Sequence, residues 1–248
     1  IPTLEDYAPT ILPVGDTLYF TASSGKTQIF KNAHPEKDAW EPVDTKLTYR
    51  LHDPAFYRDD DGKVYVVHGQ HKLYVTELNA DVRSVKGKPV EIWNKGVDDS
   101  RGSGKKAGME GSHVYKINGM YYITCPAGGT EGWQVCLRSK NIYGPYEHKV
   151  ILQDDSSYPP NGLHQGGMVQ LKNGDWWFVI MQDRGPIGRV PHLLPVKWVD
   201  GWPVLGVNGK DAITYRKPEV GKTYKVKTPA TTDEFSGKKL GLQWQWNH

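Results

Sequence analysis

A unit of roughly fifty residues returns four times along this chain, and each copy closes on a glycine turn and an aromatic strand. The copies read PTILPVGDTLYF from Pro9, DPAFYRDDDGKVYVV from Asp53, EGSHVYKINGMYYI from Glu110 and HQGGMVQLKNGDWWF from His164. A period of about 40 to 50 residues with several strands in each copy is typical of a β-propeller. The sequence therefore predicts an all-β fold with four blades visible in this chain.

The first strand of every propeller blade lines the central axis. Residues that open the units should therefore meet around one funnel, although they lie far apart in the sequence. These opening residues include Asp53, Glu110, His164 and Gln165. Two carboxylates, an imidazole and an amide in one funnel have the composition of an active site.

Turn signals support the same fold. Asp61-Gly62, Asn118-Gly119 and Asn173-Gly174 each stand just before an aromatic strand, which is the pattern of a tight hairpin. The longer charged stretches contain glycine and show no apolar face at helical spacing, so no amphipathic helix is predicted. The segment from Asp98 to Met109 is predicted to be an exposed loop that delivers the chain to Glu110.

The bulk properties exclude several classes of protein. No stretch reaches the roughly 18 consecutive apolar residues of a membrane span. The net charge is only +3 and the basic residues form no stripe, which argues against nucleic-acid binding. Nine Trp and fourteen Tyr stand against five Phe, and such rings either fill blade interfaces or stack on sugars.

The two cysteines, Cys125 and Cys136, fall on what should be neighbouring strands of one unit. A single pair in a chain of this length is weak support for a disulfide. Two buried thiols are the favoured interpretation, with a disulfide as the alternative.

Hydrolysis of a glycosidic bond usually needs two carboxyl groups, one protonated and one ionised. Asp53 is followed by Pro54, which fixes the backbone, and Glu110 is followed by Gly111, which leaves its carboxyl uncrowded. A glutamic acid among aromatic rings and near another carboxylate is expected to stay protonated near neutral pH, which suits a general acid.

The same residues have structural interpretations. Asp53 could cap a turn, as Asp-Pro pairs commonly do. His164 could be a core histidine, a ligand for a cation on the axis or a sugar contact. The run Asp59-Asp60-Asp61 lacks the spaced oxygens of a calcium loop and is interpreted as a solvated hairpin turn.

At these residues the chain resembles glycoside hydrolase family 43, whose five-bladed propellers include β-xylosidases and α-L-arabinofuranosidases. The resemblance rests on HDPAFYRDDDGKVYVVHG from His52, EGSHVYKINGMYYI from Glu110, and HQGGMVQLKNGDWWF from His164 followed by QDRGPIGRVPHLLPVKWVDGWPVLG from Gln182. AGGTEGW from Ala127 adds weaker support. Together these passages cover most of residues 7–206.

The resemblance implies a role for each of these positions. It implies that Glu110 is the general acid and that Asp53 tunes and orients it. It makes His164, Gln165 and Arg184 contacts to the sugar or to an axial ion, and adds Thr130 as a border of the sugar pocket. It requires no cofactor and is compatible with a structural calcium or sodium ion on the axis near His164.

One departure from the family pattern affects the mechanism. The family's catalytic base is an aspartate on the first strand of the first blade, whereas this chain opens with Tyr7-Ala8-Pro9-Thr10, which resembles the second blade. We therefore expect the first blade and the base to lie upstream of Ile1. The expected domains are a catalytic propeller over 1–216, a linker over 217–232 and the start of a C-terminal β-sandwich over 233–248.

The predicted function is inverting, exo-acting removal of α-L-arabinofuranosyl or β-D-xylosyl units from plant hemicellulose or its oligosaccharides. A secreted or periplasmic location is expected, because such substrates are met there. The non-enzyme alternative is a carbohydrate-binding propeller that lacks the general base. The fructan and sucrose hydrolases are a weaker alternative, because their Arg-Asp-Pro and Glu-Cys motifs are replaced here by His52-Asp53-Pro54 and Glu110-Gly111.

Overall fold

The computed structural model describes residues 7–23, 27–37, 39–47, 50–99, 104, 106–212, 214–223, 225, 232–241 and 244. The chain divides into two compact units, residues 1–216 and residues 217–248. The described residues form strands and two short 3-10 helices, and no α-helix occurs among them. No helix in the described part of the chain is long and apolar enough to cross a membrane. The prediction of an all-β chain is confirmed.

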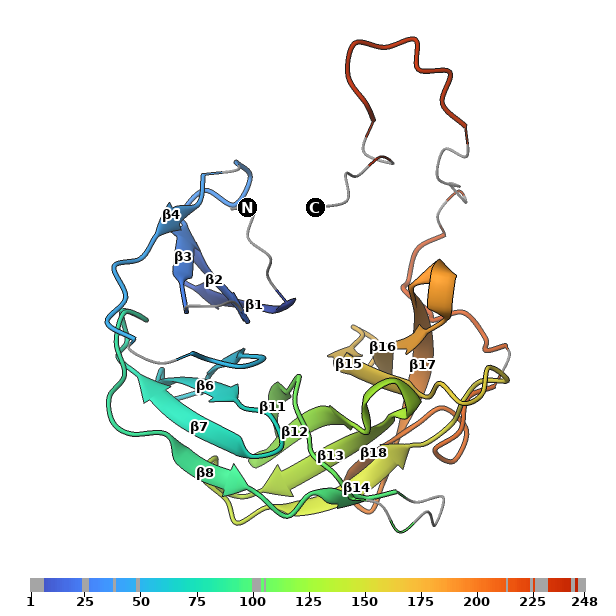
Figure 1. Ribbon diagram of the computed structural model, residues 1–248, viewed down its shortest axis with the longest axis horizontal. Coiled ribbons are helices and arrows are strands. Elements are labelled where there is room, and N and C mark those ends of the chain that lie inside the picture. Colours follow the sequence, from blue (N-terminus) through green and yellow to red (C-terminus); the bar gives the residue numbers. More distant parts are fainter. Residues whose placement is uncertain are drawn as a thin grey trace. The chain divides into compact units, whose positions relative to one another are not determined.

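Unit 1 contains four antiparallel sheets of four strands, and each sheet is one blade of a propeller (Figure 1). The first blade consists of β1 (Tyr7–Val14), β2 (Thr17–Ser23), β3 (Ile29–Asn32) and β4 (Glu41–Pro42). The second consists of β5 (Ala55–Arg58), β6 (Val64–His68), β7 (Leu73–Leu78) and β8 (Val90–Trp93). The third consists of β11 (His113–Ile117), β12 (Met120–Ala127), β13 (Trp133–Ser139) and β14 (Glu147–Leu152). The fourth consists of β15 (Leu163–Gln170), β16 (Trp176–Asp183), β17 (Arg189–Val199) and β18 (Trp202–Leu205).

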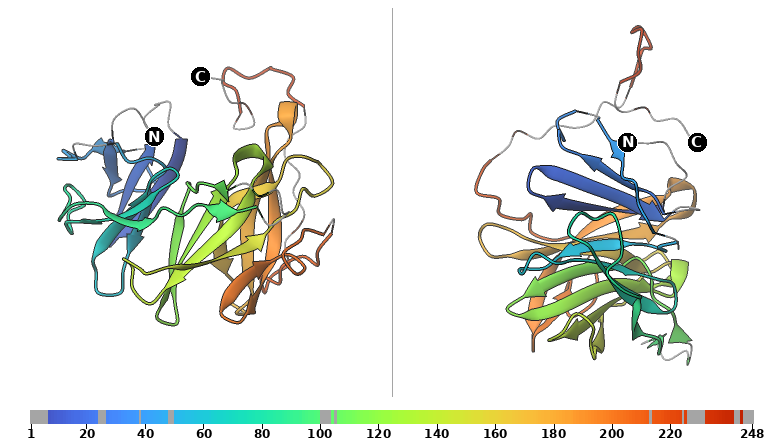
Figure 2. Two further views of the ribbon diagram at one scale, coloured as in Figure 1. Left: turned by 60° about the horizontal axis from the view of Figure 1, so that its bottom comes forward. Right: turned by 90° about the vertical axis from the view of Figure 1, so that its left-hand side faces the viewer.

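The blades follow one another in chain order around an arc, and their first strands lie on its inner side (Figures 1 and 2). Within each blade the strand order equals the chain order, so every connection joins neighbouring antiparallel strands. The predicted hairpin at Asn118-Gly119 joins β11 to β12 with both turn residues at positive φ, as a type I′ turn requires. The four predicted blades are therefore present, while a fifth blade and a β-sandwich stay predictions.

The core lies between successive blades. One buried cluster joins the first and second blades, another the second and third, and another the third and fourth. Large rings such as Trp93, Trp133 and Trp202 are buried in these clusters. Burying one such side chain stabilises the fold by very roughly 1.5–3 kcal/mol. Much of the tryptophan content therefore fills blade interfaces and is not free to stack on a ligand.

The two cysteines lie on opposite faces of the third blade. Cys125 belongs to the core between the second and third blades, and Cys136 to the core between the third and fourth. Successive side chains of a strand point to opposite faces, and the β12–β13 register pairs Thr124, not Cys125, with Cys136. Both cysteines are free and buried thiols, as the favoured interpretation expected.

Part of the segment from Asp98 to Met109, which was predicted to be a loop, forms backbone pairs. Its described residues form a two-stranded ladder of β9 (Val97–Asp98) and β10 (Lys106–Ala107). Met109 then pairs with Ala127 in an isolated bridge, which ties the segment to the end of β12 just before Glu110. The prediction of a loop was wrong at these residues, because short backbone ladders leave little signal in side-chain periodicity.

Unit 2 contains no strand among its described residues. Phe235 and Trp244 pack with ring centroids 5.2 Å apart, and the Trp244 indole N–H donates to the Asp233 carboxylate over 2.7 Å. Part of the predicted final strand lies outside the described residues, so the linker and the sandwich domain stay predictions.

Candidate active site

The structure brings together the two carboxylates that open the second and third blades. Asp53 precedes β5 and Glu110 precedes β11, and His52 lies between their carboxyl groups. The Nε2 atom of His52 is 3.1 Å from Oε2 of Glu110 and 3.7 Å from Oδ1 of Asp53. The Asp53 side chain is 11% exposed and the Glu110 side chain 40% exposed, so Asp53 lies deeper than Glu110.

A strained corner of the backbone positions Asp53. Its φ is +46°, a conformation that non-glycine residues rarely adopt, and it stands directly before Pro54. The Asp53 carboxylate accepts a hydrogen bond from the backbone N–H of Gly111, the residue after Glu110. Burial and the nearby Glu110 raise the pKa of Asp53 above its ordinary value, although His52 and the Gly111 N–H oppose this change.

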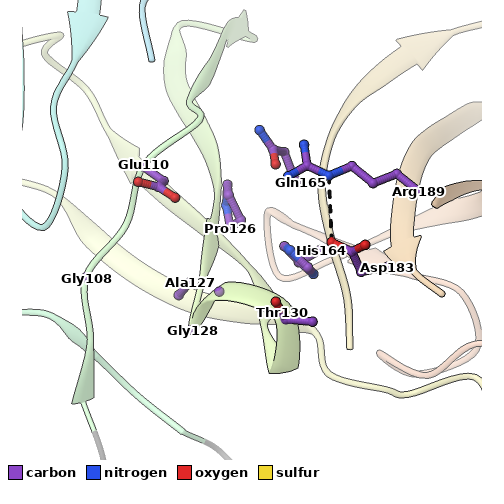
Figure 3. A pocket seen from close by; sticks show the side chains of 11 residues that line it. Gly108, Glu110, Pro126, Ala127, Gly128, Thr130, His164, Gln165, Asp183 and Arg189 are labelled. Carbon is purple, nitrogen blue, oxygen red and sulfur yellow. Dashed lines mark ion pairs between the residues drawn. The ribbon is translucent and has the colours of Figure 1, made fainter. Parts of the chain in front are cut away.

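Glu110 borders an open pocket on the inner side of the third and fourth blades. The pocket spans about 510 Å³ of empty space, including the open solvent at its mouth. Figure 3 shows the lining side chains converging from both blades. The lining residues are Gly108, Glu110, Pro126, Ala127, Gly128, Gly129, Thr130, His164, Gln165, Asp183 and Arg189.

His164 lies on β15 and is 6% exposed. Its Nδ1 is 3.0 Å from the carbonyl oxygen of Gly162, so Nδ1 carries the proton and donates it. Burial lowers the pKa of His164 below its ordinary value, and the ring is neutral at pH 7. Its Nε2 is therefore a hydrogen-bond acceptor. Because His164 lines the pocket, a purely structural role within the core does not describe it.

Gln165 lies at a bulge in β15 and has a φ of +58°. Its backbone N–H donates to Oε1 of Gln134 over 2.8 Å, which fixes the bulge to the third blade. A Cβ atom added to Gly111 would lie only 3.0 Å from the Gln165 amide nitrogen. Glycine at 111 therefore lets the Gln165 amide approach the backbone beside Glu110.

Thr130 lies in the short helix η1 (Gly129–Glu131) and borders the pocket, as the resemblance implied. Its carbonyl oxygen accepts a hydrogen bond from Gly162 N–H over 3.1 Å. This bond connects the η1 turn to the segment that leads into β15 and His164.

Arg184 lies beside this pocket and is not among its lining residues. Its Nε donates to Oε1 of Gln182 over 2.8 Å, and its guanidinium carbon is 5.2 Å from the centre of the Tyr158 ring. Two residues of the same blade that the sequence analysis did not single out, Asp183 and Arg189, line the pocket instead. They form an ion pair of 3.7 Å across the β16–β17 connection (Figure 3).

A second hollow lies on the other side of Glu110. It spans about 640 Å³ of empty space, including the open solvent at its mouth, and Glu110 and three glycines, Gly108, Gly128 and Gly129, border both hollows. Gln70 and His71 from the second blade form part of its far wall. The carboxyl group of Glu110 therefore stands at a boundary that carries few bulky side chains.

The axial ion that the resemblance allowed near His164 stays a prediction. Within the described residues, the close group of histidine and acidic side chains is His52, Asp53 and Glu110, whose polar atoms lie within 4.8 Å of one another. His164 does not belong to that group. The Asp59-Asp60-Asp61 run forms the β5–β6 turn, where Asp59 N–H donates to the Lys63 carbonyl over 2.9 Å.

Comparison with known proteins identifies the family of this propeller. Residues 2–203 match the profile of the glycosyl hydrolases family 43, which is more than three quarters of the chain. The chain belongs to glycosyl hydrolase family 43. The resemblance drawn from its motifs is therefore confirmed.

Two curated relatives are named as a beta-xylosidase and an alpha-L-arabinofuranosidase. The chain is 34% identical over 234 residues to a beta-xylosidase of Formosa agariphila, a match that covers 80% of this chain and 38% of that protein. It is 36% identical over 149 residues to a non-reducing end alpha-L-arabinofuranosidase of Bacteroides ovatus, covering 54% of this chain and 28% of that protein. The chain spans less than half the length of the curated relatives that it matches.

Solved family 43 structures share the fold. A protein described as Bacteroides ovatus Xyloglucan PUL GH43B superposes with a TM-score of 0.75 at 27% identity, covering 96% of this chain and 49% of that one. A bifunctional GH43-CE protein of Bacteroides eggerthii superposes with a TM-score of 0.71 at 33% identity, covering 83% of this chain and 26% of that one.

Proposed function

We propose that this chain carries the acid side of the active site of an inverting, exo-acting glycoside hydrolase. The enzyme removes α-L-arabinofuranosyl or β-D-xylosyl units from plant hemicellulose or its oligosaccharides. Family membership and the names of the relatives support this substrate class. The same substrate supports a secreted or periplasmic location, because hemicellulose is met outside the cytoplasm.

The observation that carries the proposal is the position of Glu110 between two hollows. A general acid must reach the oxygen that joins the departing sugar to the rest of the substrate. A carboxyl group at the boundary of two adjoining hollows can reach such an oxygen when each hollow holds one side of the bond. Glu110 is therefore the general acid that protonates the leaving oxygen.

Asp53 is a tuning residue and not the residue that attacks or activates water. Acid and base in inverting glycosidases stand roughly 6.5–9.5 Å apart so that a water fits between them. Polar atoms of Asp53 and Glu110 lie within 4.8 Å of each other, and Asp53 is not among the pocket-lining residues. Its carboxylate accepts a hydrogen bond from the Gly111 N–H, so it orients the backbone that carries Glu110.

The pocket on the fourth-blade side receives the sugar that is removed. His164 accepts a hydrogen bond from a sugar hydroxyl, Gln165 and Thr130 offer side chains that donate or accept, and Arg189 donates. Few apolar groups line this pocket, which suits a hydroxyl-rich ligand. Arg184 lies outside this pocket, with its side chain against Gln182 and Tyr158.

The test uses the complete natural protein and release of phenol from phenyl α-L-arabinofuranoside and phenyl β-D-xyloside, because phenolate is a poor leaving group that needs the acid. Glu110→Gln keeps the shape of the side chain and removes the transferable proton, so turnover should fall by about a hundredfold or more. The control is Glu36→Gln, which changes an exposed glutamate on the first blade and should leave turnover unchanged. Turnover of neither glycoside by the unaltered protein, with binding of the free sugar retained, would favour the carbohydrate-binding alternative.

A further inference from the structure

His52 makes a contact that the acid and its tuning aspartate do not explain. Its Nε2 lies 3.1 Å from Oε2 of Glu110, a hydrogen-bond distance, and 3.7 Å from Asp53. His52 precedes the first strand of the second blade and Glu110 that of the third, so the contact between them joins the two blades. His52 is 29% exposed and lines neither hollow next to Glu110.

The backbone around His52 is held from both sides. Its carbonyl oxygen accepts a hydrogen bond from Gly69 N–H over 2.8 Å, and the next residue is the strained Asp53 at φ +46°. Strained backbone persists only where surrounding contacts hold it, and it concentrates at functional sites. The carboxylate of Asp53 is fixed in turn by the Gly111 N–H. The imidazole therefore projects from a rigid corner.

Glu110 needs a contact that fixes its side-chain conformation, more than a buried residue would. Its side chain has three rotatable bonds and is 40% exposed, so several rotamers are open to it unless a contact selects one. A contact to Oε2 selects one rotamer and leaves Oε1 to carry the proton that is transferred. A misplaced acid loses catalytic efficiency even when its chemistry is intact.

We propose that His52 is a positioning residue for Glu110: its Nε2–H donates to Oε2 and holds Oε1 toward the boundary between the two hollows. This inference rests on the proposed role of Glu110 as the general acid. No bond to His52 forms or breaks. The proton moves from Oε1 of Glu110 to the leaving oxygen, and the glutamate becomes a carboxylate.

The hydrogen bond also strengthens during the reaction. Oε2 is a neutral carbonyl oxygen while Glu110 is protonated, and it gains negative charge as the proton leaves. A donor binds an ionised acceptor about twice as strongly as a neutral one. An interaction that is stronger in the transition state than in the ground state accelerates the chemical step. The benefit grows with the demand of the leaving group for a proton.

The test compares two substrates whose leaving groups differ in their need for a proton. These are the phenyl and 4-nitrophenyl glycosides of whichever sugar the complete natural protein turns over faster. Phenolate is a poor leaving group that needs the acid, whereas 4-nitrophenolate leaves with little protonation. His52→Leu should lower kcat/KM for the phenyl glycoside by about a hundredfold and for the 4-nitrophenyl glycoside by less than about tenfold. His52→Gln, which places an amide N–H near the position of Nε2, should recover most of the loss.

The control variant is His34→Leu, which removes an exposed imidazole from the first blade and should leave both substrates unaffected. An equal loss on both substrates, or no recovery in His52→Gln, would overturn the positioning role in favour of a structural one. If His52→Leu does not fold, the ratio of the two substrates in His52→Ala decides, because loss of a positioning contact changes that ratio and loss of a structural contact does not. If Glu110→Gln loses turnover and no His52 variant changes it, this inference alone is overturned. If the unaltered protein has no turnover, both this inference and the proposed function are overturned.

Discussion

Two aspartates that lie six positions apart illustrate how one residue type serves opposite purposes. Asp53 lies in the site, where burial and Glu110 raise its pKa. At Asp59 burial also raises the pKa, but hydrogen bonds from Lys116, Tyr121 and the Asp60 N–H outweigh it and lower the pKa overall. Asp53 is therefore held where its charge is costly, and Asp59 where its charge is satisfied. Such a difference separates functional from structural carboxylates.

The first prediction concerns Asp53→Asn. A group with a raised folded-state pKa contributes stability that is fully present below pH 3.8, its ordinary pKa, and is lost as the pH rises through the folded-state pKa. At pH 7 the ionised Asp53 thus opposes folding. Asp53→Asn should raise the free energy of unfolding at pH 7 by about 1 kcal/mol, while activity falls.

Urea unfolding of both proteins from pH 3 to pH 8 measures this effect. The two proteins should converge toward low pH, where Asp53 is protonated in the unaltered protein as well. A variant that is less stable than the unaltered protein at pH 7 would contradict the assignment of Asp53 as a strained, functional carboxylate.

The sequence predicted some residues of the site and missed others for a physical reason. Asp53, Glu110, His164 and Gln165 open blades, and the blade repeat alone brings such residues to the axis. Arg184 and Arg189 are separated by the short helix η2 (Gly185–Ile187), which reverses the chain between β16 and β17. A turn of this kind decides which arginine faces the pocket, and periodicity carries no information on it.

At the scale of strands, the second and third blades are joined by an ionic cluster at the ends of their inner strands. Asp59 is 8% exposed and follows β5, while Lys116 lies on β11. The Lys116 ammonium is 2.7 Å from Oδ1 of Asp59, and the Tyr121 hydroxyl donates to the other carboxylate oxygen. Glu110 precedes β11, whereas Asp59 follows β5, so the cluster and Glu110 lie at opposite ends of the inner strands. The cluster therefore holds the two blades in register at the end away from the site.

The second prediction is that Asp59→Asn lowers the free energy of unfolding by about 2 kcal/mol at pH 7, because hydrogen bonds to a buried charge are lost. The folded-state pKa of Asp59 is lowered, so the difference is present above pH 3.8 and disappears as the pH falls through that lower value. Chemical unfolding at pH 7 and near pH 2 checks the sign.

The matched control for this prediction is Asp61→Asn in the same turn. The ion pair of Asp61 with Lys63 is half-exposed on both sides, so its loss should have no measurable effect on unfolding. Equal effects at positions 59 and 61 would show that the cluster does not join the blades.

The strands themselves were predictable to a large extent, and the ladder before Glu110 was not. The Asn118-Gly119 turn and the alternating strands around it follow from local chemistry. The β9–β10 ladder of two residues on each side depends on backbone pairing with little side-chain pattern. Its ends are fixed by neighbours, including the Met109–Ala127 bridge, which joins residues that are distant in the repeat.

At the scale of unit 1, the two end blades differ from the two middle blades. Phe178, Ile180 and Leu194 of the fourth blade pack toward the third, while Val179 and Leu193 on the opposite face are 50% and 42% exposed. Val179 and Leu193 are directly paired across β16 and β17, so they form a contiguous apolar surface. The first blade likewise exposes Ile11, which is paired with Phe20 across β1 and β2. Phe20 belongs to a small apolar cluster of the first blade, separate from the core that this blade shares with the second blade.

Exposed apolar faces on propeller blades are expected to be covered, because each blade buries one face against each neighbour. The third prediction is that a fifth blade covers the face of Val179 and Leu193 in the complete natural protein. Leu193→Asp should then place an unpaired charge in a blade interface and lower the free energy of unfolding by about 3 kcal/mol or more. Val220→Asp, at a position of similar exposure in unit 2, should change it by less than about 0.5 kcal/mol. Urea unfolding of the complete protein distinguishes the two variants, and equally small effects would show that the face of the fourth blade meets solvent and that the ring stays open.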